Sequence, residues 1–148
     1  MVRLKAILLV EDNPRDVELT LEALSDYNLA NRVTVMKDGV EAMEYLRYEG
    51  AYKTRPKGSP AVMLMDIKMP RMDGIEVLQA VRRDEQLRTI PVVMLTSSRE
   101  EPDLKRCYDL GVNAYVVKPV NFRQFIDAVK QAGVFWALIN ELPLERSE

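Results

Sequence analysis

Residues 61–66 read AVMLMD, and this stretch decides the fold that the sequence predicts. The five apolar residues 61–65 leave no polar face, which is typical of a strand in a parallel sheet with helices on both sides. The run ends in one carboxylate, Asp66, and a pattern with helical spacing starts at Gly74. The stretch therefore predicts a buried strand, a turn that carries an acid, and a helix.

The same unit recurs along the whole chain. Strand-like apolar runs occupy residues 6–10, 32–36, 61–65, 91–95 and 114–117. Helical patterns occupy residues 16–24, 39–47, 74–82, 102–110 and 121 to about 142. Five alternating pairs predict one α/β domain over residues 1–148, with a parallel sheet between two helical layers. Residues 49–60 are rich in Lys, Gly and Pro, and we expect them to form a surface insertion.

The composition excludes several kinds of site and partner. The chain has no histidine, which rules out histidine bases, Ser-His-Asp triads and histidine-bound zinc. Its one cysteine, Cys107, leaves no intrachain disulfide and suits the cytoplasm. A formal charge of −2 predicts no direct binding of nucleic acid. The apolar runs are too short for a membrane span, so no membrane partner is expected.

Polar residues follow four of the five predicted strands at the point where each strand ends. They are Glu11 and Asp12 after the first, Asp66 after the third, Thr96 after the fourth and Lys118 after the fifth. The carboxyl ends of parallel strands share one edge of the sheet, where open α/β sheets bind ligands. Each residue alone has an ordinary explanation, such as a helix cap or a turn. Their convergence at one edge favours a functional site.

The chemistry of this set is specific. Three close carboxylates raise one another's pKa unless a cation neutralises them, and oxygen ligands point to Mg2+ or Ca2+. A carboxylate can also attack phosphorus and form an aspartyl phosphate. That transfer requires neutralised and aligned phosphoryl oxygens, which a cation, Lys118 and Thr96 can provide.

Four stretches resemble the response-regulator receiver family in order and spacing. They are LLVEDN at 8–13, LMDIKMPRMDG at 64–74, VMLTS at 93–97 and GVNAYVVKP at 111–119. The resemblance covers about residues 4–130 and, with four linked motifs, is specific. It implies a flavodoxin-like (βα)5 fold in three α/β/α layers, strand order 2-1-3-4-5, and a long C-terminal helix.

The resemblance also implies a role for each site residue. Asp66 resembles the phosphoacceptor, and Lys118, followed by an often cis Pro119, resembles the phosphate-contacting lysine. Thr96 and Tyr115 resemble the switch pair. Magnesium would be held by Glu11, Asp12, Asp66 and the backbone carbonyl of Lys68. The implied function is that of a two-component response regulator, which accepts phosphate from a sensor histidine kinase and catalyses only its own phosphorylation and dephosphorylation. The signal would leave by protein contact, through the fourth helix, fifth strand and fifth helix.

Lys68 departs from the commonest receiver pattern, and its position two residues after the acceptor borders the phosphoryl group. We therefore expect Lys68, together with Ser98, to tune the phosphoryl lifetime.

The insertion and the tail resemble stand-alone receivers that partner bacterial and cyanobacterial phytochromes. The carrying residues are Tyr45 and Leu46 with the 49–60 loop, and Phe135 with Trp136. The last helix is apolar on more than one face, which predicts burial beyond one sheet. A tail folded onto its own domain and a two-fold homodimer both satisfy this, and the homodimer is favoured. Its candidate residues are Phe135, Trp136, Leu138 and Leu142.

Three other functions compete with this interpretation. An aspartyl-nucleophile phosphatase would carry a second aspartate where Lys68 stands. A flavin or nucleotide carrier needs a glycine-rich loop after a strand, and none follows any predicted strand. A scaffold that never takes phosphate remains open, although the intact acid, hydroxyl and lysine set argues against it.

Overall fold

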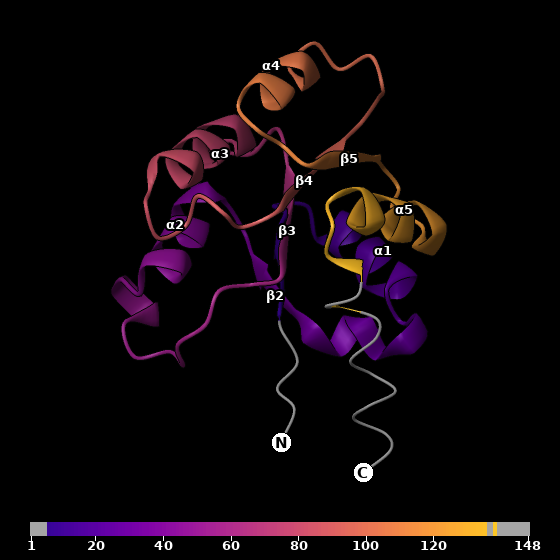
Figure 1. Cartoon of the computed structure of the whole chain (residues 1–148). Coiled ribbons are helices and arrows are strands. Elements are labelled where there is room, and N and C mark those ends of the chain that lie inside the picture. Colours follow the sequence, from indigo (N-terminus) through magenta and orange to yellow (C-terminus); the bar gives the residue numbers. More distant parts are fainter. Residues whose placement is uncertain (1–5, 136–137, 139–148) are drawn as a thin grey trace.

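A computed structural model describes residues 6–135 and residue 138, and its centre is a parallel five-stranded sheet (Figure 1). The strands are β1 (Ile7–Val10), β2 (Val33–Met36), β3 (Val62–Asp66), β4 (Val92–Thr96) and β5 (Ala114–Val117). The helices are α1 (Pro14–Ala23), α2 (Gly39–Arg47), α3 (Gly74–Arg83), α4 (Leu104–Asp109) and α5 (Phe122–Gln131). The strand order is β2-β1-β3-β4-β5, which confirms the predicted flavodoxin-like class.

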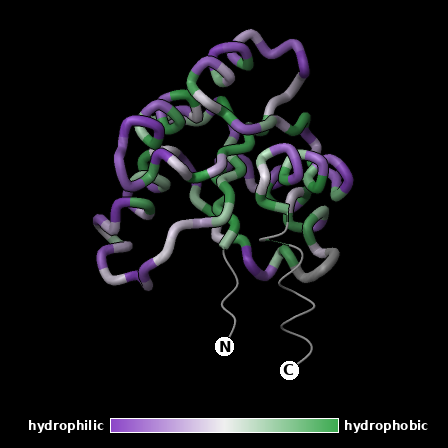
Figure 2. The backbone as a smooth tube through the Cα atoms, in the orientation of Figure 1, coloured by the Kyte–Doolittle hydropathy of each residue, from purple (hydrophilic) through white to green (hydrophobic). Residues whose placement is uncertain are grey.

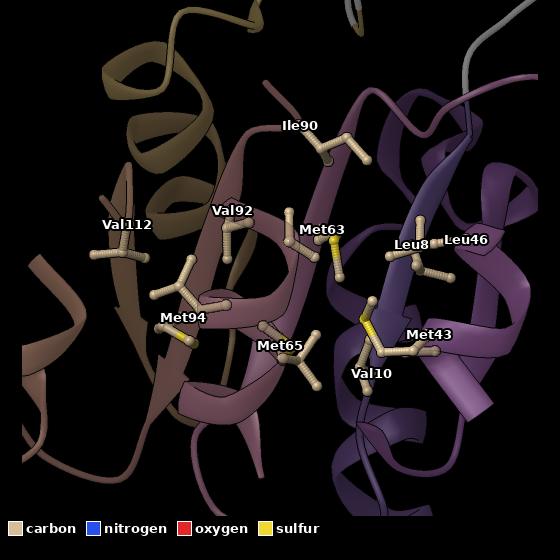
Figure 3. Close-up of a cluster of buried hydrophobic side chains, with 14 of the residues drawn as sticks. Leu8, Val10, Met43, Leu46, Met63, Met65, Ile90, Val92, Met94 and Val112 are labelled. Carbon is tan, nitrogen blue, oxygen red and sulfur yellow. The ribbon is translucent and has the colours of Figure 1, made fainter. Parts of the chain in front are cut away.

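The sheet separates two hydrophobic clusters. Helices α2, α3 and α4 cover one face and α1 and α5 cover the other, as Figure 1 shows. Apolar residues run through the middle of the chain trace and polar residues gather outside it (Figure 2). Figure 3 shows the first cluster, in which Met63 and Met65 of β3 lie between Met94 of β4 and the α2 residues Met43 and Leu46. The second cluster contains Leu24, Leu29, Phe125, Val129 and Leu138. Burial on both faces explains why the strands carry no polar alternation.

Some helices begin or end at other residues than predicted. Helix α1 begins two residues earlier than expected because Asn13 caps it, accepting from the backbone N–H groups of Arg15 and Asp16 at 2.9 and 3.3 Å. Pro14 suits the first turn, where its missing N–H costs nothing. Helix α4 is shorter than expected, and the 3-10 segments η1 (Asp26–Arg32) and η2 (Gly50–Tyr52) were not predicted.

Two helices approach neighbouring backbone closely enough to require glycine. A Cβ on Gly74 would overlap the carbonyl oxygen of Asp66, and a Cβ on Gly39 would overlap that of Met72. Gly74 therefore allows α3 to pack directly against the end of the strand that carries Asp66.

Arg82 joins the end of α3 to the loop before β4 and to the loop before β5. Its guanidinium donates to the carbonyl oxygens of Arg88 and Ile90 at 3.0 and 2.8 Å. It also donates to the carbonyl oxygen of Gly111 at 3.1 and 2.8 Å and to Asn113 Oδ1 at 3.0 Å. One side chain thus secures the segment between α4 and β5.

The insertion at residues 49–60 lies at the surface and is held by Arg55. The Arg55 guanidinium lies 3.9 Å from the ring centres of both Tyr45 and Tyr48, and its Nε donates to the Tyr45 carbonyl at 2.6 Å. Tyr48 accepts a bond from Gly58 N–H at 2.8 Å, and Tyr52 donates to Glu41 at 2.7 Å. The insertion is therefore tied to α2 by specific contacts.

The C-terminal helix is present, but it is interrupted well before the expected end at about Leu142, and residues 139–142 lie outside the described residues. Helix α5 ends at Gln131, where Gly133 adopts a left-handed conformation with φ +80°. Gly133 N–H and Val134 N–H bond back to the carbonyls of Lys130 and Val129 at 3.1 and 2.9 Å, a pattern that terminates helices.

The tail residues proposed for a dimer separate into two groups. Leu138 is fully buried in its own chain, and its carbonyl accepts a bond from Arg32 at 2.7 Å. Leu138 therefore follows the alternative in which the tail folds back on its own domain. Phe135 is half-buried, with Lys130 Nζ 5.0 Å from its ring centre. Trp136 and Leu142 lie outside the described residues.

Within residues 6–135, no helix is long and apolar enough to cross a membrane.

Candidate phosphoacceptor and metal site

The carboxyl edge of the sheet brings the predicted site residues together. Asp66 ends β3 beside Leu95 of β4, and Thr96 ends β4 beside Val117 of β5. The N–H of Glu11 bonds to the carbonyl of Met36, so Glu11 continues directly from β1 at the same edge. Parallel pairing explains how residues far apart in the sequence meet here.

Glu11, Asp12 and Asp66 form one acidic cluster. Each offers a carboxylate oxygen, and these oxygens lie within 4.8 Å of one another. Glu11 and Asp66 are buried, at 1% and 8% exposure, whereas Asp12 is exposed. Buried like charges at this separation require a cation or protons to balance them.

Lys118 supplies one positive charge to this cluster. Its Nζ lies 3.0 Å from Glu11 Oε1, 3.0 Å from Asp66 Oδ2 and 3.0 Å from Asp16 Oδ2. Burial would lower the pKa of Lys118, but the carboxylates of Glu11, Asp66 and Asp16 outweigh it and hold that pKa above its ordinary value. Lys118 is therefore charged at neutral pH and points at the carboxylate of Asp66. The Lys118–Pro119 peptide bond is cis, as the resemblance implied.

The carboxyl group of Glu11 has a perturbed pKa. Burial raises the pKa of Glu11 to about 7, the Lys118 ammonium opposes that rise, and the Asp66 charge adds to it. Its Oε1 is buried and lacks an aligned hydrogen bond, although Lys118 Nζ lies close by. A buried oxygen without a hydrogen bond, next to two further carboxylates, fits a divalent cation that displaces a proton.

An open cavity of about 260 Å³ lies against Asp66. Its lining residues are Asp66, Ile67, Lys68, Leu95, Thr96, Ser97, Glu101 and Lys118. The lining combines the carboxylate of Asp66 with two lysines and two hydroxyl side chains, and such lysines and hydroxyls can donate to the oxygens of a phosphoryl group. The expected metal contact through the Lys68 carbonyl remains a prediction.

Thr96 lines this cavity, whereas Tyr115 is not among its lining residues, and no described hydrogen bond joins the two side chains. Thr96 is buried, and its hydroxyl donates to the carbonyl of Ser98 at 2.9 Å. Tyr115 is half-buried, and its ring packs edge-on against Tyr108 with centres 6.4 Å apart. Ser98 itself is exposed, and its hydroxyl accepts from Glu100 N–H at 3.0 Å.

Sequence reasoning missed three acids at this site. Asp16 contacts Lys118, and Lys68 Nζ lies 3.9 Å from Glu101 and 3.8 Å from Asp103. Asp16 follows the cap Asn13 in the first turn of α1, so its place beside the end of β1 was a usable signal. Glu101 and Asp103 had no such signal, because their position depends on the path of the loop before α4.

Comparison with known proteins gives consistent relatives. The response regulator receiver domain family matches residues 7–130. The structure of the bacteriophytochrome response regulator AtBRR is 62% identical, with a TM-score of 0.86, over 94% of this chain and 99% of that chain. The phosphorylated cyanobacterial phytochrome response regulator RcpA is 42% identical, with a TM-score of 0.73, over 90% of this chain and 94% of that chain.

A third relative is the response regulator Rcp1 from Synechocystis sp. It is 36% identical over 139 residues, which cover 94% of this chain and 93% of the relative. The structure of its Mn2+-bound form is 35% identical in the superposed region, with a TM-score of 0.70, over 89% of this chain and 92% of that chain.

Proposed function

Because this chain belongs to the response regulator receiver family, we propose that it accepts a phosphoryl group on Asp66 from a sensor histidine kinase, with Mg2+ as cofactor. The observation that carries the proposal is the placement of Lys118. Its Nζ lies 3.0 Å from Asp66 Oδ2 and 3.0 Å from Glu11 Oε1 at the wall of an open cavity. A charged lysine beside a nucleophilic carboxylate suits the transfer of an anionic group.

The proposed step forms one bond and breaks one bond. A carboxylate oxygen of Asp66 attacks phosphorus, and the bond from phosphorus to the donor nitrogen of the kinase histidine breaks, with its electron pair staying on that nitrogen. Lys118 donates to one phosphoryl oxygen, and the Thr96 hydroxyl turns from the Ser98 carbonyl to another. In dephosphorylation, water attacks phosphorus, the bond from phosphorus to the Asp66 oxygen breaks, and inorganic phosphate is released from the free carboxylate.

Glu11, Asp12, Asp66 and the Lys68 carbonyl would hold the cation. When bound, Mg2+ would neutralise negative charge on the phosphoryl oxygens. Support for a divalent cation comes from the buried Oε1 of Glu11 and from a relative, Rcp1, described in an Mn2+-bound form.

The proposed partner is a bacteriophytochrome-like histidine kinase. Two relatives, AtBRR and RcpA, are named as phytochrome response regulators, and RcpA is described as phosphorylated. In this proposal the protein works in the cytoplasm, catalyses only its own phosphorylation and dephosphorylation, and signals through the surface of α4, β5 and α5.

The protein forms a homodimer in this proposal. Phe135 contributes to the interface, whereas Leu138 does not, because it is fully buried in its own chain. Sedimentation of the full chain as a monomer at high concentration would contradict the homodimer.

The decisive experiment incubates the full chain with Mg2+ and acetyl phosphate and measures its intact mass. We expect a gain of one phosphoryl group, which is absent in Asp66→Asn and in the presence of a chelator. Failure to gain mass with acetyl phosphate and with candidate kinases would overturn the proposal.

A further inference from the structure

Asp16 is a carboxylate at the site edge that neither the acidic cluster nor the cavity lining includes. It lies in the first turn of α1, and its backbone N–H donates to the Asn13 cap at 3.3 Å. Its Oδ2 is 3.0 Å from Lys118 Nζ, and its side chain is 26% exposed. The cap thus fixes the turn from which Asp16 reaches Lys118.

Three carboxylates share the single ammonium of Lys118. An ammonium has three N–H donors, and Glu11, Asp16 and Asp66 each lie 3.0 Å from Nζ. Two of these acids, Glu11 and Asp66, also belong to the cluster that fits a divalent cation. Asp16 does not, so it is the one partner that Lys118 keeps when the other two acids bind elsewhere.

We propose that Asp16 is a positioning residue, which holds Lys118 at the cavity wall while Glu11 and Asp66 turn to a divalent cation and a phosphoryl group. This inference rests on the proposed function. Without the Asp16 charge, the close acidic partners of Lys118 would be two cation ligands alone. The ammonium would then stay on those ligands and compete with the cation.

The charge balance supports the same role. Lys118 is 19% exposed at its side chain, so it cannot move far into solvent without losing its bonds. A bond to Asp16 satisfies one donor and leaves two donors for the cavity. Asp16 therefore lets Lys118 change partners without becoming an unpaired, partly buried charge.

The test uses the full chain and three variants. Asp16→Asn removes the charge, Asp16→Glu restores it on a longer side chain, and Glu18→Gln removes a charge from an exposed position on the same helix. Calorimetric titration gives the Mg2+ dissociation constant. Intact mass gives the rate of phosphorylation by acetyl phosphate as a function of Mg2+ concentration, and thermal unfolding reports stability.

We expect Asp16→Asn to weaken Mg2+ binding by roughly tenfold, which is typical for groups that orient metal ligands. The Mg2+ concentration at half-maximal phosphorylation rate should rise by the same factor, and the maximal rate should fall. Asp16→Glu should recover most of the affinity, and Glu18→Gln should match the wild type in both measurements.

Two results would overturn the inference. One is a wild-type Mg2+ affinity and rate in Asp16→Asn; the other is a loss that Asp16→Glu does not rescue and that follows thermal stability. A wild-type chain that gains no phosphoryl group overturns the proposed function instead, and the calorimetric comparison of the variants still decides the role of Asp16.

Discussion

Helix α3 begins against the carbonyl of Asp66, and helix α4 begins three residues after Glu101, which lines the cavity beside Asp66, but the two helices begin in different ways. Asp73 caps α3 by accepting from Glu76 N–H at 2.9 Å, and Glu76 returns a bond from its side chain to Asp73 N–H at 3.0 Å. Helix α4 has six residues, against ten in α3, and Asp103 makes no side-chain cap bond. One helix is therefore locked at its start and the other is not.

The loop after Asp66 contacts the start of α2 more strongly than it contacts the segment at the start of α4. Arg71 makes a bidentate contact with Asp38, at 3.0 and 3.1 Å, which ties the loop to the start of α2. Lys68 reaches Glu101 and Asp103 only at 3.9 and 3.8 Å, and its side chain is 72% exposed. Exposed pairs of this kind contribute at most about 1 kcal/mol. A change of charge at Asp66 should therefore displace the start of α4 while α3 stays in place.

Gly74→Ala tests how firmly the start of α3 is held, and it should have the largest effect on stability. A Cβ there would overlap the Asp66 carbonyl, so we expect the free energy of unfolding to fall by about 3 kcal/mol. Gly133→Ala is the matched control, because its φ is +80° and no atom lies within 4 Å of the new Cβ. It should cost about 1 kcal/mol from backbone strain alone. Equal losses in urea denaturation would show that α3 does not pack tightly on the acceptor strand.

The reactivity of Cys107 tests whether α4 is held less firmly than α3. Cys107 is fully buried, so alkylation requires α4 to open, and burial also raises the pKa of its thiol to about 11, which slows the reaction at pH 8. We expect Cys107 to react about tenfold faster than a thiol introduced by Val81→Cys on α3 in a Cys107→Ala background. Val81 is fully buried, which makes the two positions comparable. A slower reaction at Cys107 would reverse the comparison.

Capping variants measure the two helix starts directly. Asp73→Ala removes the capping box and should lower the free energy of unfolding by about 1 kcal/mol. Asp103→Ala removes no cap bond and should lower it by less than about 0.5 kcal/mol. Chemical denaturation of both variants checks the difference, and equal values would mean that α4 is capped as firmly as α3.

Lys68→Ala should have the smallest effect, and it acts on lifetime. Lys68 lines the cavity beside Asp66, so its removal should admit water and shorten the life of the phosphorylated protein by about threefold. Arg71→Ala removes a cation from the same loop on the other side and should leave the lifetime unchanged. The decay of the phosphorylated mass decides, and an unaltered rate in Lys68→Ala would remove that residue from lifetime control.

Particular residues show how far the sequence predicted the molecule. The apolar strands and the charged residues that follow them sufficed to place Glu11, Asp66 and Lys118 at one edge, because parallel pairing determines that edge. The end of α5 was missed because apolar spacing continues past Gly133, whereas the left-handed φ of that residue ends the helix. The Lys68 contacts were missed because they depend on a loop path that no local pattern encodes.

Arg82 holds one end of the segment that contains α4. It holds the carbonyl of Gly111 and the side chain of Asn113, so the segment that follows α4 is anchored to α3 while the segment before it is not. A helix that is held at one end can tilt about that end, which for α4 lies near Gly111. We therefore expect a small displacement of residues 97–103 to tilt α4 and to move Tyr108, which is exposed on that helix.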